Sequence, residues 1–322
     1  MSKFLKILAI VLGIVVVFLL LFATYIQFSP LPKYDNNAPP LKVSADSLKL
    51  EEGEKLAKTL CAMCHLSDDG KLGGKHMTDA SQFGEIHSTN ITHHPEHGRL
   101  DQYSDGELAY LIRTGIKKDG SYAPPWMVKL PQLSDYDMES LISFLRTDHS
   151  LLQSSDKPNK ETQLNFLSKM LIKMGVFSPL SYPEGPITSP SPSDKVAYGK
   201  YLTLFKYDCY ACHSADFAKC DFQNPEKSVG FLGGGNPIPD LTGKPILSSN
   251  LTMDKKTGLG NWTEEEFIRA VKIGLRTDKI SNRYPMMPFT LLKDEEVSAI
   301  WAYLQTVPII HNPNDFTPDE DI

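Results

Sequence analysis

The chain has 322 residues, of which 41% are hydrophobic and 22% charged, a composition that excludes a disordered or fibrous protein. Its 33 basic and 39 acidic residues give a formal net charge of −6, which lacks the basic footprint of a nucleic-acid-binding protein. At about 150 residues per domain, the length predicts about two domains.

The first predicted element is an apolar helix at the N-terminus. Ile7 to Ile26 contains no charged residue and would span about 30 Å as a helix, the thickness of one hydrocarbon core. The run is longer than the apolar region of a cleaved signal peptide, and a poor cleavage site follows it. We therefore predict a membrane anchor over 1–28, with a cleaved signal peptide as the alternative. Because Lys3 and Lys6 precede the run, the rest of the chain is expected across the membrane from the cytoplasm.

Two short motifs each place a histidine directly after a pair of cysteines. Cys-x-x-Cys-His is the attachment signature of c-type haem, in which two thiols bond to the porphyrin and the histidine becomes the proximal iron ligand. A dithiol redox pair does not need the histidine, and a zinc site would need further ligands at similar short spacings. The sequence therefore predicts two covalently bound haem c groups, held by Cys61, Cys64, His65, Cys209, Cys212 and His213.

The two halves of the chain resemble each other beyond these motifs. Residues 88–92 resemble residues 248–252, and residues 100–115 resemble residues 259–274. Both of the longer segments contain a helix-capping box, then apolar residues at i, i+3 and i+4, then a glycine, which together predict a helix. The chain therefore contains two copies of one unit.

Two further helices are predicted in each unit. Apolar residues at i, i+3, i+4 and i+7 begin at Met138 and at Val297, and they predict the last helix of each unit. An earlier helix precedes each haem motif, and Gly53 and Gly199 within it should allow a close approach to the last helix. Because strand signals are almost absent, we predict an all-α fold, with two haem domains in tandem after one transmembrane helix.

The second iron ligand is expected from a loop between the haem motif and the last helix. Methionine there would raise the redox potential, because a soft sulfur ligand favours ferrous iron. Residues 124–128 offer Met127, and residues 284–288 offer Met286 or Met287. Aligning the two loops on a proline favours Met287, whereas an ungapped alignment back from the last helices favours Met286. We predict Met127 and Met287.

Other histidines and the fifth cysteine need a separate interpretation. Five histidines precede the Met127 loop and keep a bis-histidine first haem open as an alternative: His76, His87, His93, His94 and His97. His149 and His311 lie outside the expected ligand regions and should face solvent. Cys220 lies outside both motifs; we expect it to be buried, with an intermolecular disulfide or a reactive thiol as alternatives.

A connector joins the two units. Within residues 150–193, Leu164 to Phe177 could form a short amphipathic helix, and the stretch from Ser178 to Ser193 is rich in proline. We predict a packed connector that lies across both units. The alternative is an interfacial helix that rests on the membrane or on a partner.

Three segments resemble one protein family. They are Phe83–Thr92, Thr257–Trp262 and Tyr284–Pro288. They are similar to the cytochrome c subunits of membrane-bound alcohol and gluconate dehydrogenases and to related multihaem class I cytochromes. The resemblance covers about residues 46–148 and 194–307.

The resemblance implies covalent attachment and histidine–methionine ligation of both haems. One haem would be bound by Cys61 and Cys64, with His65 and Met127 axial. The other would be bound by Cys209 and Cys212, with His213 and Met287 axial. The chain departs from the family in carrying two haem motifs rather than the typical three, in an N-terminal rather than C-terminal anchor, and in Met127-Val128 where the family has Met-Pro. These departures concern the dehydrogenase partner and leave the haem chemistry intact.

The expected function is electron transfer. We predict a dihaem cytochrome c anchored in a bacterial inner membrane by a single pass, with its haem domains in the periplasm. It would pass single electrons between a dehydrogenase or quinol-oxidising complex and a downstream acceptor, and it would bind no nucleic acid. Its own side chains would transform no substrate, because the haem irons do the redox work. The alternatives are an enzyme of the dihaem peroxidase type and a tightly bound subunit of a dehydrogenase or terminal oxidase complex.

These predictions divide the chain into six parts. They are an anchor at 1–28, a tether at 29–43, a first cytochrome c domain at 44–149, a linker at 150–193, a second cytochrome c domain at 194–312 and an acidic tail at 313–322.

Overall fold

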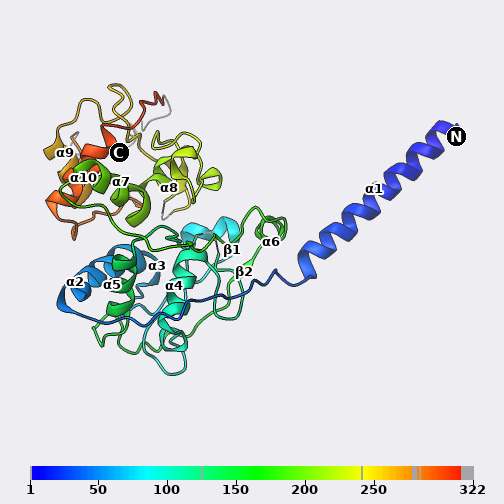
Figure 1. Ribbon diagram of the computed structural model, residues 1–322. Helices are drawn as coiled ribbons and strands as arrows, with labels where there is room; N and C mark the ends of the chain where they lie inside the picture. The colour runs from blue at the N-terminus through cyan, green and yellow to red at the C-terminus, as the bar shows by residue number, and fades with distance from the viewer. Residues whose placement is uncertain (1, 125, 241, 278–280, 283, 313–322) are drawn as a thin grey trace.

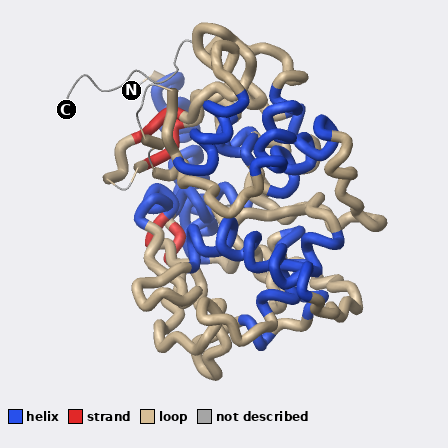
Figure 2. The backbone as a smooth tube through the Cα atoms, turned by 90° about the vertical axis from the view of Figure 1, so that its left-hand side faces the viewer, coloured by secondary structure: helices blue, strands red, loops and turns tan. Residues whose placement is uncertain are grey.

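A long N-terminal helix projects from a body made of two helical units (Figure 1). The computed structural model describes residues 2–124, 126–240, 242–277, 281–282 and 284–312. The predicted acidic tail at 313–322 lies outside the described residues. In the view of Figure 2, the helices gather in two groups, one above the other, and loops make up much of the surface.

Helix α1 (Lys3–Phe28) is 26 residues long, and almost all of its side chains are exposed. Among the described residues it is the one helix whose length and apolar character would allow it to cross a membrane. An anchor and a signal sequence both fit this observation. Ile26 is the one buried residue of α1, at the end that meets the body.

The predicted tether is extended, and it is also bonded to the first unit. The backbone N–H of Tyr34 donates to the carbonyl of Gly120 at 2.8 Å. The N–H of Val43 donates to the Asp105 carboxylate at 2.9 Å. Prolines block regular structure in this segment, but the amides between them remain free to bind a neighbouring surface.

The first unit contains the helices that the sequence predicts. In chain order they are α2 (Ser47–Leu56), the π-helical turn η1 (Ala57–Cys61), α3 (Ala62–His65), the 3₁₀ turns η2 (Thr78–Phe83) and η3 (Leu100–Gln102), α4 (Asp105–Thr114) and α5 (Asp135–Leu145). The predicted capping box of Ser104 and Glu107 opens α4, and Gly115 ends it in the left-handed conformation, with φ 82°.

The second unit repeats this order. It contains α7 (Lys195–Tyr201), the π-helical turn η4 (Leu202–Lys206), α8 (Cys209–His213), the 3₁₀ turns η5 (Phe217–Lys219) and η6 (Pro225–Lys227), α9 (Glu264–Ile273) and α10 (Asp294–Leu304). Thr263 and Glu266 form the capping box of α9, and Gly274 ends it with φ 74°. The duplication read from the sequence is therefore a duplication of structure.

Glycine allows the first and last helices of each unit to touch. A Cβ atom on Gly53 of α2 would lie 2.0 Å from the carbonyl oxygen of Ser140 in α5. A Cβ atom on Gly199 of α7 would lie 1.8 Å from the carbonyl oxygen of Ala299 in α10. Neither distance permits a side chain, so the predicted role of both glycines is confirmed.

Helices dominate the regular secondary structure of the described residues, which also contain two short antiparallel ladders that the sequence did not predict. β1 (Gly84–Glu85) pairs with β2 (Gln163–Leu164), and β3 (Pro237–Pro239) pairs with β4 (Pro245–Leu247). Each strand is only two or three residues long, too short for an alternating apolar pattern to show in the sequence. The prediction of an all-α fold therefore holds only as a mostly helical one.

The connector is packed against the first unit. Its β2 pairs with β1, and its helix α6 (Phe166–Lys173) begins at the Asn165 cap, inside the segment predicted to be helical. Further along, the N–H of Leu180 donates to the carbonyl of Thr114 at 3.0 Å. The connector therefore has fixed contacts along much of its length.

The two units meet through charged side chains that are largely removed from solvent. Lys55 of α2 pairs with Glu296 of α10 at 2.8 Å and with Glu52 at 2.9 Å. Lys206 of η4 pairs with Asp137 of α5 at 3.0 Å and with Glu52 at 2.8 Å. Asp137 and Glu296 stand at the same place in the last helices of their units. The first unit therefore offers two carboxylates to Lys206 of the second unit, and the second unit offers Glu296 to Lys55 of the first.

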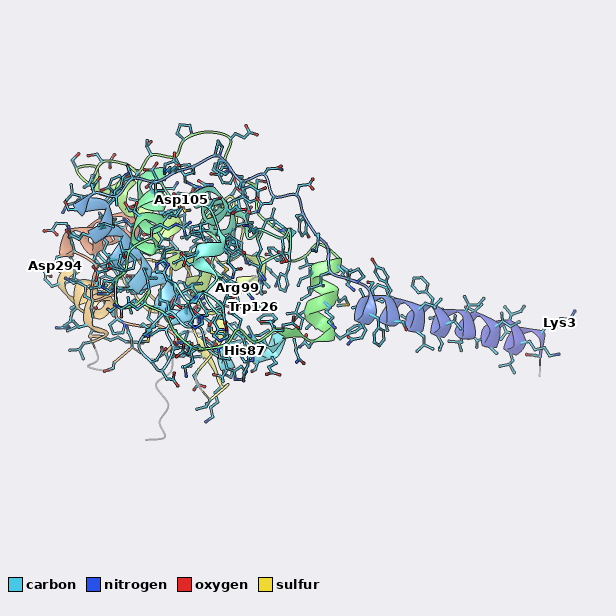
Figure 3. The ribbon with its side chains drawn as sticks, turned by 90° about the horizontal axis from the view of Figure 1, so that it is seen from below. Lys3, His87, Arg99, Asp105, Trp126 and Asp294 are labelled. Carbon is cyan, nitrogen blue, oxygen red and sulfur yellow. The ribbon has the colours of Figure 1, made fainter. Side chains whose placement is uncertain are left out.

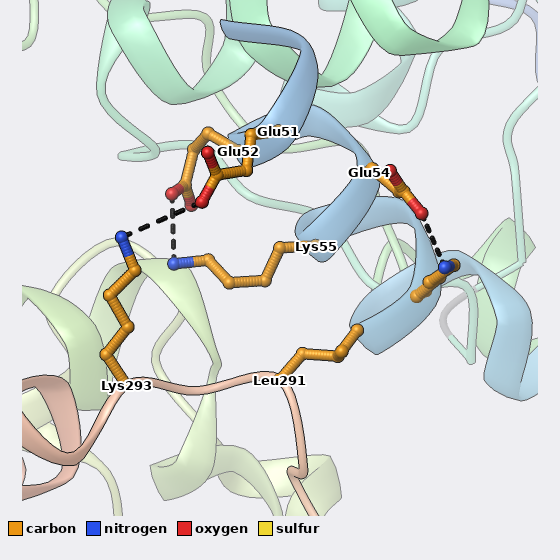
Figure 4. Close-up of a pocket in the computed structure, with 7 residues that line it drawn as sticks. Glu51, Glu52, Glu54, Lys55, Leu291 and Lys293 are labelled. Atoms are coloured by element: carbon orange, nitrogen blue, oxygen red, sulfur yellow. Dashed lines mark hydrogen bonds and ion pairs between the residues drawn. The ribbon is translucent and has the colours of Figure 1, made fainter. Parts of the chain in front are cut away.

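Two tyrosines and opposite charges stabilise this network. The Tyr201 hydroxyl donates to Asp137, and the Tyr207 hydroxyl donates to Glu296 at 3.1 Å. Burial alone would raise the pKa of Glu52, but the neighbouring lysines outweigh it and lower that pKa. Burial alone would lower the pKa of Lys206, but Asp137 and Glu52 raise it. Figure 4 shows the adjoining pocket, where Lys55 reaches Glu52.

Candidate haem sites

The first haem motif ends in a histidine whose orientation is fixed by a backbone carbonyl. His65 ends α3, and its Nδ1 lies 2.7 Å from the carbonyl oxygen of Thr89. Since a carbonyl only accepts hydrogen bonds, Nδ1 carries the proton and Nε2 keeps its lone pair for a metal. Burial lowers the pKa of His65, which favours the neutral imidazole that a metal ligand must be.

The second motif repeats this arrangement. His213 ends α8, and its Nδ1 lies 2.8 Å from the carbonyl oxygen of Ser249. Burial also lowers the pKa of His213. Thr89 and Ser249 lie at corresponding places in the two repeated segments at 88–92 and 248–252. A backbone carbonyl at the equivalent position therefore orients the histidine in each unit. The repeated segments were recognised in the sequence, but their contact with the histidines was not predicted.

A glycine holds each of these segments next to its histidine. The N–H of Gly74 donates to the carbonyl of His65, and that of Gly234 donates to the carbonyl of His213, each at 2.8 Å. Both glycines have positive φ, 79° and 68°. A Cβ atom on Gly74 would lie 2.4 Å from the Ser88 carbonyl oxygen. Leu-Gly-Gly occurs at 72–74 and again at 232–234, so the repeat includes these glycines as well.

Gly234→Ala should therefore destabilise the second haem site. The new Cβ would lie 2.5 Å from the Ser248 carbonyl oxygen, next to the carbonyl that orients His213. We expect a loss of about 1–3 kcal/mol in the free energy of unfolding, because strained backbone and close contact act together. Gly243→Ala is the matched control, since Gly243 also has positive φ but nothing within 4 Å. Equal effects of the two substitutions in chemical denaturation would contradict the proposed contact.

The motif cysteines are free thiols that lie within the folded units. Burial raises the pKa of Cys61 and of Cys209 to about 12. Cys220 is half-buried, and its Sγ faces the carbonyl oxygens of Ala211 and Asp216, each 3.6 Å away. Each motif thus supplies two unpaired thiols and one oriented imidazole, which is the donor set that covalent haem c requires.

Matching hydrogen bonds frame the two loops that are predicted to carry the distal ligands. In the first unit, the Ala123 N–H donates to Gly115 at 2.7 Å and the Leu130 N–H donates to Ile112 at 2.8 Å. Met127 lies between these bonds. In the second unit, the N–H of residue 282 donates to residue 274 at 2.6 Å and that of residue 289 donates to residue 271 at 2.9 Å. The two loops therefore have equal length between equivalent anchors.

This register pairs Met127 with Met286 rather than with Met287. Met286 lies four residues after its first anchor, as Met127 does. Met287 then corresponds to Val128, and the two are similarly exposed, at 48% and 42%. The alignment on proline, which favours Met287, and the backbone register, which favours Met286, therefore give different distal ligands.

The histidines of the rival bis-histidine ligation are engaged in other contacts. His93 uses Nδ1 on Asp101 at 2.8 Å and Nε2 on the Thr147 carbonyl at 3.0 Å. His94 accepts the N–H of His97 at its Nδ1, at 2.9 Å. The remaining two, His76 and His87, stack on each other with ring centroids 4.9 Å apart. These contacts favour methionine as the ligand in the first unit. Of the two histidines expected to face solvent, His311 is 54% exposed and His149 is 29% exposed at their side chains.

The distal loop of the second unit contacts the wall of the first haem site. The Tyr284 hydroxyl donates to the Asp79 carboxylate, in the 3₁₀ turn η2. Asp79 lies close enough to Cys64 that its charge adds to burial in raising the pKa of that thiol. On the same wall, Phe83 stacks on Trp126 with ring centroids 4.7 Å apart. The two candidate haem sites therefore adjoin each other through this contact.

Two helical units with these thiol and imidazole sets define a c-type haem protein. The chain belongs to the cytochrome c family, whose model, described as Cytochrome c, matches residues 50–148 and 196–308. The two matched regions coincide with the two structural units, and the family implies covalently bound haem c.

Three similar proteins are cytochrome c subunits of dehydrogenases. The chain is 28% identical over 292 residues to the alcohol dehydrogenase (quinone) cytochrome c subunit of Gluconobacter oxydans, covering 86% of this chain and 58% of that protein. It is 27% identical over 283 residues to the same subunit of Gluconacetobacter polyoxogenes, covering 82% and 57%. It is 27% identical over 274 residues to the gluconate 2-dehydrogenase cytochrome c subunit of Pantoea cypripedii, covering 82% and 60%. The chain thus spans less than two thirds of the length of these relatives.

Proposed function

We propose that this chain is a membrane-anchored dihaem cytochrome c that carries single electrons. The observation that supports this best is the duplicated setting of the two Cys-x-x-Cys-His motifs. In each unit, a backbone carbonyl fixes the histidine Nδ1 and leaves Nε2 to a metal. Haem c in each motif would supply an iron that cycles between the ferric and ferrous states, while the protein sets ligands and orientation.

The proposed attachment residues are Cys61, Cys64, Cys209 and Cys212, with His65 and His213 as proximal ligands. Met127 is the proposed distal ligand of the first haem. For the second haem we propose Met287, because Met287-Pro288 matches the Met-Pro pattern of the family that the sequence resembles. Met286 is its rival on the backbone register. Both methionines lie in the same loop, so the haem assignment itself is the same in either case.

The proposed organisation follows the sequence prediction and the contacts between parts. Residues 1–28 would form the anchor and 29–43 the tether, here laid along the first unit. Residues 44–149 and 194–312 would be the cytochrome c domains, joined by the linker 150–193, with the acidic tail at 313–322. With Lys3 and Lys6 on the cytoplasmic side, both haem domains would lie in the periplasm of a bacterial inner membrane.

The proposed partners are redox proteins. The relatives are named as cytochrome c subunits of alcohol and gluconate dehydrogenases, which supports a dehydrogenase or quinol-oxidising complex as the electron donor. A downstream acceptor would complete the chain, and the formal charge of −6 suits a partner with a basic docking surface. Whether the chain is a free carrier or a firmly bound subunit is decided by its mass after gentle detergent extraction.

The Tyr284–Asp79 contact would keep the two haem sites close enough for electron exchange. Tyr284→Phe removes the hydroxyl that binds Asp79 and leaves the ring. Since one such bond contributes about 0.5–1.5 kcal/mol, its loss should lower the ratio of docked to undocked loop by about two- to tenfold. We expect electron transfer between the haems after flash reduction to slow by up to the same factor. Tyr110→Phe is the control, because the Tyr110 hydroxyl bonds the tether at Asp35 instead. An unchanged rate of electron transfer between the haems in Tyr284→Phe would show that this contact does not keep the two sites close.

The main rival is a peroxidase, and peroxide separates the two functions. A peroxidase needs an iron with an open or displaceable sixth position, whereas two methionine-ligated haems have none. We expect optical redox titration of the full chain in detergent to show two one-electron steps, and added peroxide to cause no turnover. Sustained oxidation of a donor dye by peroxide would favour the peroxidase instead.

A further inference from the structure

Helix α6 is bonded directly to the end of the N-terminal helix. Lys173 of α6 donates from Nζ to the carbonyl oxygens of Tyr25, Ile26 and Ser29, at 3.1, 2.8 and 2.6 Å. The last carbonyls of a helix lack partners in a following turn, so Lys173 supplies a donor to the Ile26 carbonyl, and its positive charge is favourable at the negative end of the helix dipole. Figure 3 shows α6 beside the last turns of α1, at the edge of the body. Helix α6 therefore lies at the level where α1 ends.

The other side of α6 is fixed to the first haem unit. Asn165, which caps α6, donates its backbone N–H to the carbonyl of Phe83 at 3.0 Å. Ser168 donates its hydroxyl to the same carbonyl at 2.9 Å. The ring of Phe83 stacks on Trp126, the neighbour of Met127. Helix α6 is thus a rigid link between α1 and the distal loop of the first haem site.

The remaining surface of this link is apolar and exposed. Leu167 is 49% exposed, and beyond the helix Met174 and Val176 are 61% and 57% exposed. At the end of α1, next to this surface, Tyr25 and Phe28 are 60% and 79% exposed. The apolar surface of α1 therefore continues onto residues 166–177 instead of stopping where the body begins.

We propose that residues 166–177 lie in the lipid headgroup interface of the membrane that α1 crosses. This inference rests on the proposed anchor. The apolar length of α1 matches the hydrocarbon core, so its C-terminal end must lie at the interface, where exposed aromatic side chains are enriched. Lys169 and Lys173 donate to the carbonyls of Gln27 and Ile26, so they hold α6 at the same level as the end of α1. The first haem site is then held close to the membrane surface.

A lipid interface explains this surface better than a protein partner does. The surface lies at the end of α1, where the proposed anchor itself fixes the height of the bilayer. Other exposed apolar residues, such as Ile273 at 60% and Ile309 at 64%, lie on the second unit. They provide the comparison positions for a test.

Site-specific photocrosslinking in native membranes tests this placement. p-Benzoylphenylalanine would replace Leu167, Met174, Phe18 or Ile273, one at a time, in the full haem-loaded chain. Phe18, in the middle of α1, is the lipid reference, and Ile273 is the exposed control. After illumination, mass spectrometry separates lipid adducts from protein adducts, and the haem absorption spectrum confirms that each variant is folded.

We expect lipid adducts at Leu167 and Met174 in a yield close to that at Phe18 and at least about tenfold above that at Ile273. Lipid adducts at Phe18 without any at Leu167 and Met174 would overturn the interfacial placement while leaving the anchor in place. Adducts of Leu167 to another polypeptide would show that a protein partner or a second copy of the chain, and not lipid, covers this surface. The absence of lipid adducts at Phe18 would refute the anchor, and the inference with it.

Discussion

Lys206→Met should lower the free energy of unfolding by about 3–5 kcal/mol. The Lys206 side chain is only 4% exposed and lies between Asp137 and Glu52, at 3.0 and 2.8 Å. Without this cation, Asp137 loses its lysine partner, and Glu52 keeps Lys55, which it shares with Glu296. Because the side chains of Asp137 and Glu296 are only 5% and 6% exposed, water can do little to replace the lost partner, and the penalty is far larger than for a surface pair.

Lys200→Met is the matched control for this prediction. Lys200 belongs to the same unit and pairs with Glu226 at 2.8 Å, but both side chains are exposed, at 39% and 56%. Its loss should change stability by less than about 1 kcal/mol. The comparison uses guanidinium unfolding of the full chain in detergent, followed by circular dichroism. Equal midpoints for the two variants would show that the network does not hold the units together.

The same network predicts a loss of stability in acid. Lysines hold the pKa of Glu52 below its usual value, so Glu52 contributes stability above its unfolded pKa, about 4.3. This contribution is lost as the pH falls through the lower folded value. Glu52→Gln should therefore flatten the acid limb of the stability profile measured by thermal unfolding. If the acid limb of Glu52→Gln is as steep as that of the wild type, groups other than Glu52 cause the loss of stability in acid.

Removing a distal methionine should change the electronic state of one haem and leave the other intact. Met127→Ala should abolish the long-wavelength absorption band of methionine-ligated ferric iron for the first haem. The redox potential of that haem should also fall, because the ferrous state loses its soft ligand. The measurement is an optical redox titration of the full chain, in which one of the two steps moves and the other stays.

The second loop offers its own matched control, because two methionines are adjacent. Met287→Ala should abolish the band of the second haem, and Met286→Ala should leave it unchanged. The backbone register gives the opposite expectation, since Met286 stands where Met127 stands. Loss of the band in Met286→Ala alone would therefore transfer the ligand to Met286, without affecting the proposal of two haems. Retention of the band in both variants would exclude this loop.

Local patterns allowed much of the fold to be predicted. The capping boxes at Ser104 and Thr263 each need only four consecutive residues to be recognised, and both are present in the structure. The close helix contacts at Gly53 and Gly199 could be predicted for a similar reason, because the two glycines stand at equivalent positions in two predicted helices. The two matched regions of the cytochrome c family likewise follow the repeat.

Contacts between distant residues could not be predicted from one sequence. Lys55 and Glu296 are 241 positions apart, and nothing in the local pattern of either residue indicates the other. The carbonyls that orient His65 and His213 belong to the backbone, so no residue type reveals them. The packing of the tether on the first unit and the hydrogen bonds from Lys173 to the end of α1 are also contacts between distant residues. They depend on how the units assemble rather than on local propensity.

The number of haems per chain tests the central proposal most directly. Purified full-length protein should exceed its sequence mass by two haems, and its haem-to-protein ratio by pyridine haemochrome should be two. A variant with both Cys209→Ser and Cys212→Ser should lose one haem and keep the other on Cys61 and Cys64. A single haem in the wild type, or a double variant that still carries two, would contradict the dihaem cytochrome.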